Sequence, residues 1–246
     1  MGMWRFFVDR AAIQGDEAML DEAESRHLSK VLRLATGERV TLFDGQGAVY
    51  EGIILEAGDK ARLRILSRRE ENAGARPLVI AQAILRGAQM DELTRRYTEL
   101  GVDALIPIWT SRCQGSFDAP RESQRQFRRL RIIEAACKQS GRARPLRLEA
   151  PKSFADFLAD SSEEKSGWRR LMFWEDEKTT SLRDLPFADA EGVVALIGPA
   201  GGWKSEEAAM ARERGFSAVR LSGHVLRAET AGLAVAALCQ FLLRNI

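Results

Sequence analysis

The pattern of apolar and polar positions in the first part of the chain predicts short β-strands. Apolar runs at residues 40–43 and 48–55 are separated by Asp44-Gly45, and this dipeptide between two such runs predicts a β-hairpin. A further apolar run at 61–66 completes a small barrel-like β module, and residues 24–32 have helical spacing with Leu28, Val31 and Leu32 on one face. The polar stretch 67–76, closed by Pro77, is typical of a linker.

From residue 78 the pattern changes to alternating strands and helices. This alternation predicts an α/β fold with a mostly parallel sheet and helices on both of its faces. The linker then divides the chain into two domains, residues 1–72 and 73–246. The expected strands are 78–85, 104–108, 146–149, 170–174, 193–197 and 218–221, and the expected helices are 90–100, 121–140, 154–159, 205–214 and 228–244.

Composition narrows the class of protein. The 246 residues are 45% hydrophobic and 29% charged, as in ordinary soluble globular proteins. The longest apolar stretch, 231–243, contains Gln240 and is too short for a membrane span, and the N-terminus lacks a secretion signal. The three cysteines are scattered without zinc-ligand spacing. These features predict a cytoplasmic protein with reduced thiols, no membrane partner and no metal.

Charge is unevenly distributed although the net charge is only +2. Nine lysine and arginine residues lie between 121 and 147, opposed only by Glu122 and Glu134. Such a local excess is the expected footprint of a polyanion such as RNA. The alternative is a solvated helix face without a partner.

The stretch Gly198–Ser205, GPAGGWKS, has the glycines, lysine and serine of a phosphate-binding loop. A Walker A motif would require glycine at position 203, where Trp203 would fill the space that phosphate needs. Glu206 and Glu207 then begin the next predicted helix and would repel phosphate. The sequence therefore excludes a nucleoside triphosphate site here.

Two loops that follow predicted strands, 197–203 and 221–231, concentrate unusual residues. Ligands of parallel α/β sheets bind outside the carboxyl ends of the strands. The glycines permit a flat ligand to approach the backbone, and Leu221, Val225 and Leu226 suit an adenine slot. The alternative is a pair of ordinary strand–helix connections with capping residues.

Together, GPAGGW and LSGHVLRAETA resemble the signature of the SPOUT methyltransferases, and within them the RsmE family, which methylates N3 of a uridine in small-subunit ribosomal RNA. Three further segments resemble blocks of that family, so the likeness covers nearly the whole chain. They are HLSKVLRL at 27–34, ELGV at 99–102 with Pro107, Ser111 and Arg112, and QSGR at 139–142.

The resemblance implies a PUA-like N-terminal barrel for RNA and a C-terminal α/β domain with a deep trefoil knot. It also implies a homodimer, ribosomal RNA within the small subunit as substrate, and S-adenosylmethionine held by the knotted loops without a metal. The cofactor-binding residues would be Ile197, Gly198, Gly201, Gly202, Leu221, Ser222, Val225 and Leu226.

The same resemblance assigns roles in catalysis and RNA binding. Arg227 or Arg112 would stabilise the anion that forms when N3 of uridine loses its proton, and Glu229 would accept that proton or position Arg227. The catalytic group is Arg227, Glu229 and Thr230. The RNA-binding group is Arg26, His27, Lys30, Arg33, Arg112, Arg128, Arg129, Gln139 and Arg142.

The chain departs from the family pattern in both loops. Ala200 stands where the family usually has glutamate, Ser222 replaces glycine, His224 replaces arginine and Ala228 replaces threonine. Two alternatives therefore stay open. One is a SPOUT methyltransferase acting on another base or on a ribose 2′-hydroxyl, which its product nucleoside would reveal. The other is a non-catalytic RNA-binding or assembly factor on the same scaffold.

Overall fold

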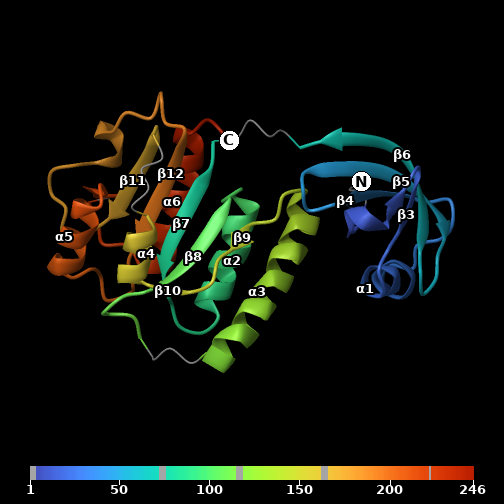
Figure 1. The fold of residues 1–246 in the computed structure, drawn as a ribbon, viewed down its shortest axis with the longest axis horizontal. Coiled ribbons are helices and arrows are strands. Elements are labelled where there is room, and N and C mark those ends of the chain that lie inside the picture. The colour runs from blue at the N-terminus through green and yellow to red at the C-terminus, as the bar shows by residue number, and fades with distance from the viewer. Residues whose placement is uncertain (1–3, 72–75, 115–118, 162–165, 222) are drawn as a thin grey trace. The chain divides into compact units, whose positions relative to one another are not determined.

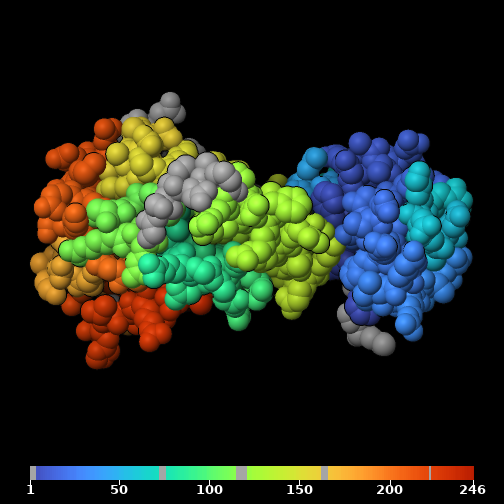
Figure 2. Space-filling model, turned by 90° about the horizontal axis from the view of Figure 1, so that it is seen from below, coloured from blue at the N-terminus to red at the C-terminus, as the bar shows by residue number. Residues whose placement is uncertain are grey.

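The computed structural model describes residues 4–71, 76–114, 119–161, 166–221 and 223–246 (Figure 1). The chain divides into two compact units (Figure 2). Unit 1 comprises Met1–Gly74 and Glu134–Pro145, and unit 2 comprises Ala75–Ile133 and Leu146–Ile246. Each unit has its own sheet, which the two rhythms of the sequence predict.

Unit 1 is built on a curled sheet of six strands in the order β1-β4-β5-β6-β3-β2. Only β1 and β4 are parallel, and the predicted hairpin is confirmed as antiparallel pairing of β4 with β5. The predicted linker is wrong over 67–70, because β6 continues through these residues, and β2 and β3 were not predicted. The strands are β1 (Arg5–Phe7), β2 (Ile13–Gln14), β3 (Glu17–Met19), β4 (Arg39–Phe43), β5 (Ala48–Glu56) and β6 (Arg62–Glu70).

The helical segment of unit 1 closes the core of the sheet. It consists of α1 (Glu22–Arg26) and the π-helical turn η2 (His27–Val31), and it follows the short 3-10 helix η1 (Arg10–Ala12). Leu28 is fully buried in a cluster with Phe6, Leu42 and Leu63. The Asp21 side chain caps α1 by accepting a hydrogen bond from the Glu24 N–H at 2.7 Å.

Residues 134–145, which the predicted division at 72/73 places in the second domain, form a second segment of unit 1. Lys138 forms an ion pair with the buried Glu24. The Glu71 carboxylate accepts hydrogen bonds from the backbone N–H groups of Ala143 and Arg144 at 3.1 and 2.9 Å. These long-range contacts, which no local pattern reveals, assign the segment to unit 1.

Unit 2 contains a parallel sheet in the order β10-β8-β7-β12-β11-β13, with β9 also paired to β8. The six strands predicted for this part are confirmed, and only the short β10 was missed. The strands are β7 (Leu78–Ala83), β8 (Ala104–Trp109), β9 (Arg147–Leu148), β10 (Lys152–Ser153), β11 (Trp168–Phe173), β12 (Gly192–Ile197) and β13 (Ser217–Val219).

Helices cover both faces of the unit 2 sheet, as the alternation predicts (Figure 1). Successive strand residues point to opposite faces, so Ala81 and Ala83 of β7 pack with α4 and α5. Gln82 faces α2, where its Oε1 accepts a hydrogen bond from the Tyr97 hydroxyl at 2.8 Å. The helices are α2 (Gln89–Glu99), α3 (Ala119–Ser140), α4 (Phe154–Asp160), α5 (Ser205–Glu213) and α6 (Ala228–Leu242), with a 3-10 turn η3 (Leu182–Asp184).

No helix among the described residues combines the length and apolar character needed to cross a membrane. Within the same residues, no group of three or more histidine, cysteine, aspartate or glutamate side chains could hold a metal ion.

Candidate functional site

The register of the sheet brings three loops together. Phe173, the last residue of β11, lies beside Ile197 of β12 on one side and Val219 of β13 on the other. Because all three strands are parallel, their carboxyl ends meet at one edge. The loops after β11, β12 and β13 therefore surround one volume, and two of them are the loops singled out in the sequence.

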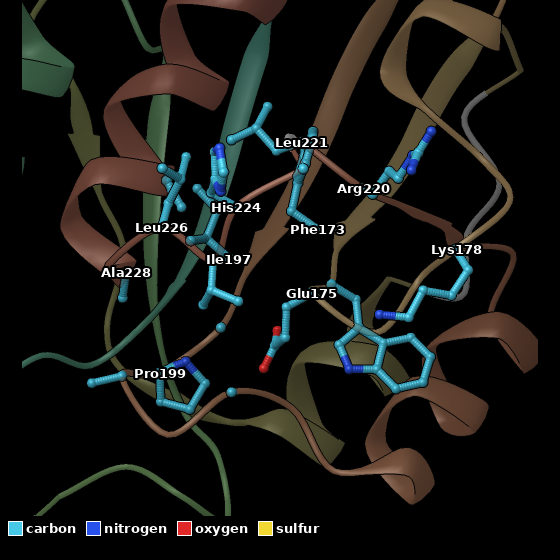
Figure 3. A pocket seen from close by; sticks show the side chains of 17 residues that line it. Phe173, Glu175, Lys178, Ile197, Pro199, Arg220, Leu221, His224, Leu226 and Ala228 are labelled. Carbon is cyan, nitrogen blue, oxygen red and sulfur yellow. The ribbon is translucent and has the colours of Figure 1, made fainter.

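These loops line a cavity of about 200 Å³ (Figure 3). Ligand pockets usually have volumes of roughly 300–1,000 Å³, so a nucleoside-sized ligand would extend beyond this cavity. Val225, one of the lining residues, is 81% exposed. Six of the predicted cofactor-binding residues line the cavity, namely Ile197, Gly198, Gly202, Leu221, Val225 and Leu226. Ser222 lies outside the described residues.

Trp203 holds the first loop in place. Its side chain is buried against Phe154 and Gly198, and its indole N–H donates a hydrogen bond to the Phe173 carbonyl at 2.9 Å. A side chain at position 198 would collide with the indole, so glycine is required there. Trp203 thus ties the β12 loop to the end of β11, and the exclusion of a phosphate-binding loop agrees with this buried position.

Gly201, predicted to bind the cofactor, is not among the residues that line the cavity. Its carbonyl accepts a hydrogen bond from the Arg112 guanidinium at 2.8 Å, and the Trp203 carbonyl accepts another at 3.3 Å. Arg112, predicted to bind RNA, is therefore a clamp on the loop. Glu207 of α5 completes the anchor by accepting from the backbone N–H groups of Ser111 and Lys204, both at 2.9 Å.

The predicted catalytic residues lie at the start of α6. Arg227 is the exposed N-cap residue, Glu229 is half-buried and Thr230 is exposed. Ala228 and Ala231, on the same turns, line the cavity, whereas the three predicted residues are not among its lining residues. The helix thus presents alanines to the cavity, and the Arg227 side chain is exposed to solvent.

The loop after β11 supplies wall residues that the sequence interpretation missed. It contributes Trp174, Glu175 and Lys178, whereas Arg220 comes from the end of β13. A signal was present, since this loop also follows a predicted strand, but it has no glycine motif. The remaining lining residues not predicted to bind cofactor are Phe173, Pro199, Ala200, Gly223, His224, Ala228 and Ala231.

Glu177 shapes the β11 loop from outside the cavity wall. The Thr179 hydroxyl donates to its Oε1 at 2.6 Å, as do the backbone N–H groups of Thr179 and Thr180 at 2.8 and 3.1 Å. These hydrogen bonds lower the pKa of Glu177 to about 2. Its other oxygen binds Arg212, whose guanidinium lies 5.3 Å from the centroid of the Trp174 ring. The loop is therefore braced by an ionised carboxylate.

The described departures from the family pattern gather at this cavity. Ala200, His224 and Ala228 all line it. The loss of a carboxylate at 200 and of a guanidinium at 224 thus affects one shared wall.

The unit 1 residues predicted to bind RNA lie in a mixed environment. Arg26 and Lys30 line a groove that also contains Lys60 and four acids, Asp9, Asp21, Glu22 and Asp59. These acids offset the positive charge. His27 is half-buried with its ring against Phe6, and burial lowers its pKa. Arg33 and Gln139 are exposed and Arg142 is half-buried.

Helix α3 exposes one of its two predicted RNA-contact residues and buries the other. The Arg129 side chain is only 3% exposed and its Nη1 lies 2.7 Å from Glu122 Oε1, so it is a structural residue without RNA-accessible surface. Arg128 is 58% exposed and forms an ion pair with Asp91. Arg125 and Arg131 are also exposed. The helical period explains the difference, because it turns one member of the Arg128-Arg129 pair inward.

Comparisons with known proteins agree with this architecture. Residues 72–240 match the RNA methyltransferase domain family, and residues 20–66 match the RNA methyltransferase PUA domain. The ribosomal RNA small subunit methyltransferase E of Mycobacterium bovis is 29% identical over 227 residues, covering 92% of this chain and 87% of its own length.

Two solved structures have the same fold throughout. The ribosomal RNA small subunit methyltransferase E of Neisseria gonorrhoeae, bound to S-adenosylmethionine, is 30% identical with a TM-score of 0.86 and 98% coverage of both chains. A putative methyltransferase of Legionella pneumophila, also with bound S-adenosylmethionine, is 29% identical with the same TM-score and coverage. The family match over most of the chain and this full-length likeness lead to one conclusion: the chain belongs to the RNA methyltransferases of the small-subunit methyltransferase E (RsmE) family.

Proposed function

We propose that this protein transfers a methyl group from S-adenosylmethionine to N3 of a uridine in small-subunit ribosomal RNA. The observation that carries the proposal is the cavity where the GPAGGW and LSGHVLRAETA loops meet at the ends of β12 and β13. Relatives of about the same length, 29% and 30% identical, hold S-adenosylmethionine, which supports this choice of cofactor.

The cavity residues fit this cofactor. Phe173, Ile197 and Leu226 give an apolar wall for the adenine ring. Gly202, with φ of +70°, adopts a backbone conformation that favours glycine and brings the main chain to the wall. Lys178 and Arg220 supply positive charge for the cofactor's carboxylate. When bound, S-adenosylmethionine supplies an electrophilic methyl group.

The target nitrogen carries a proton, so the protein must remove it and stabilise the resulting anion on the uridine oxygens. The structure favours Arg227 over Arg112 for this task, because the Arg112 guanidinium already donates to two backbone carbonyls. In the described part of the chain, Arg227 makes no such bond and its side chain is exposed. In this proposal Glu229, two positions later, accepts the proton or orients Arg227.

The assembly and the knot belong to the same proposal. Unit 1 is a PUA-like module that contributes to RNA binding, and the two loops of unit 2 form a trefoil knot. A second copy covers the apolar side chains exposed on and after α6, which include Leu238, Phe241 and Ile246. The substrate is the RNA within the small ribosomal subunit.

The basic side of α3 provides a test of RNA binding. We expect Arg128→Glu combined with Arg131→Glu to weaken binding of small-subunit RNA by about tenfold or more, because each arginine that contacts phosphate releases counterions. The slope of log affinity against log salt should fall by about one per lost contact. Filter binding across a salt series measures both quantities.

Arg214→Glu is the matched control, since Arg214 is an exposed arginine at the end of α5. Affinity for S-adenosylmethionine should change less than twofold in either protein. Equal RNA binding by the double variant and the control would show that the arginines on α3 are only a solvated face.

The proposed function itself is tested in two steps. Calorimetric titration should show saturable binding of S-adenosylmethionine, with ATP as the non-binding control. Small subunits from cells lacking this activity are then incubated with protein and cofactor, and their RNA is digested and analysed by mass spectrometry for 3-methyluridine. A different methylated nucleoside would assign the protein to another SPOUT specificity.

A non-catalytic RNA-binding factor is the second candidate. It is favoured by one observation, that Ala200 and His224 replace charged residues on the cavity wall itself. This candidate predicts binding of small-subunit RNA without binding of S-adenosylmethionine, so the calorimetric step separates the two.

A further inference from the structure

A single acid faces the cavity among the described residues that line it. That residue is Glu175, and the other ionisable lining side chains, Lys178, Arg220 and His224, are basic. Figure 3 shows the Glu175 side chain directed toward the Pro199 loop. A lone carboxylate among bases and apolar groups points to a specific hydrogen-bonding partner on the ligand.

The sheet register fixes the position of Glu175 between the two cofactor loops. Phe173 pairs with Ile197 and with Val219 across the parallel strands. Two residues beyond this row stand Glu175, Pro199 and Leu221, and all three line the cavity. The carboxylate therefore comes from the loop that follows the central strand of the three.

The side chain of Glu175 lies close to the glycine loop. Its carboxylate occupies the space that a Cβ at Gly202 would need, with the carboxyl carbon 3.0 Å from that position. The residue is nonetheless solvent-exposed, so it is not a buried structural group. Among the described residues, no hydrogen bond or ion pair engages its oxygens, unlike those of Glu177.

The neighbouring wall indicates which part of the cofactor the carboxylate meets. An adenine ring placed against Phe173, Ile197 and Leu226 would carry its ribose one bond away. Glu175 lines the same cavity, two residues beyond Phe173. An ionised carboxylate has only acceptor oxygens, and the vicinal hydroxyls of ribose are a matching pair of donors.

We propose that Glu175 binds the ribose hydroxyls of the methyl donor, an assignment that rests on the proposed function. It makes Glu175 a cofactor-specificity residue supplied by the β11 loop, outside both of the sequence motifs. The interaction selects an adenosyl group with an intact diol and is independent of the sulfonium charge and of the methionine portion.

The experiment compares four ligands by calorimetric titration of wild-type protein, Glu175→Gln and Asp176→Asn. Asp176 is an adjacent exposed acid that does not line the cavity, so its variant is matched in charge and position. The ligands are S-adenosylmethionine, S-adenosylhomocysteine, 5′-methylthioadenosine and the 2′-deoxy form of 5′-methylthioadenosine. Thermal unfolding of each protein verifies that the fold is intact.

We expect Glu175→Gln to bind the three ribose-containing ligands about tenfold or more weakly, because a hydrogen bond to a charged acceptor is lost. Asp176→Asn should stay within twofold of wild type. Wild type should bind the deoxy ligand at least about fivefold more weakly than its ribose counterpart, and Glu175→Gln should distinguish these two less than twofold.

Two results would overturn the assignment. One is equal discrimination between ribose and deoxyribose by wild type and Glu175→Gln. The other is a loss confined to ligands that carry the amino-acid portion, which would assign Glu175 to the α-ammonium group. Failure of the proposed function looks different, because wild-type protein would then not bind S-adenosylmethionine at all.

Discussion

Replacing Arg227 by alanine is expected to lower kcat for methyl transfer by about 10²–10³-fold, the usual cost of removing a group that stabilises a developing anion. Arg227 is the exposed N-cap residue of α6 and stands in the sequence between the cavity-lining residues Leu226 and Ala228. In the proposed function its guanidinium stabilises the anion on the uridine oxygens. Single-turnover methylation of small subunits with radiolabelled S-adenosylmethionine measures the effect.

The control for this variant is Arg214→Ala, which removes an exposed arginine at the end of α5. Both variants should keep wild-type thermal stability and bind S-adenosylmethionine within about twofold of wild type, since neither side chain lines the cavity. A wild-type rate for Arg227→Ala would remove this residue from the site and leave Arg112 as the candidate cation.

Replacing Gly232 by alanine is expected to destabilise unit 2 by about 2–4 kcal/mol, as for other cases of an overpacked core combined with a broken buried hydrogen bond. A Cβ at this position would overlap the Tyr97 hydroxyl and lie 3.1 Å from Gln82 Oε1. Both groups are fully buried. This expected loss of stability exceeds the roughly 1 kcal/mol by which the helix propensity of alanine is more favourable than that of glycine.

Urea unfolding followed by tryptophan fluorescence measures this loss, because four of the five tryptophans belong to unit 2. Gly223→Ala is the control within the same unit, since no atom lies within 4 Å of a Cβ added there, and its stability should change by less than about 0.5 kcal/mol. Combining Gly232→Ala with Tyr97→Phe removes the obstructing hydroxyl and should cost less than the sum of the single changes. Strict additivity would contradict the steric explanation.

The periodicity of the sequence was a good guide to the elements of unit 2. Alternating apolar runs predicted its six main strands and five helices, because local spacing records which side chains face the core. The pattern did not predict the short strands β2, β3 and β10, because runs of two or three residues are too short to show a period. The assignment of residues 134–145 to unit 1 was not predicted either, because the Lys138–Glu24 pair joins positions far apart in sequence.

The candidate site was predictable only where glycine motifs mark it. Those motifs identified six cavity residues, but Trp174, Glu175 and Lys178 lie on a loop without such a motif. The motifs could not distinguish the faces of a turn either, so Gly201 and Arg112 were assigned to ligands although they bind each other.

The sequence by itself determined the class of fold, the position of the two loops and the family resemblance, because strand and helix periods and glycine spacing are local properties. Only the tertiary structure decided which side chains share the cavity. Parallel pairing of β11 between β12 and β13 brings Glu175 beside Pro199 and Leu221, and helical rotation buries Arg129 while exposing Arg128. Such neighbours are fixed by long-range register and by burial, which depend on the whole chain folding together.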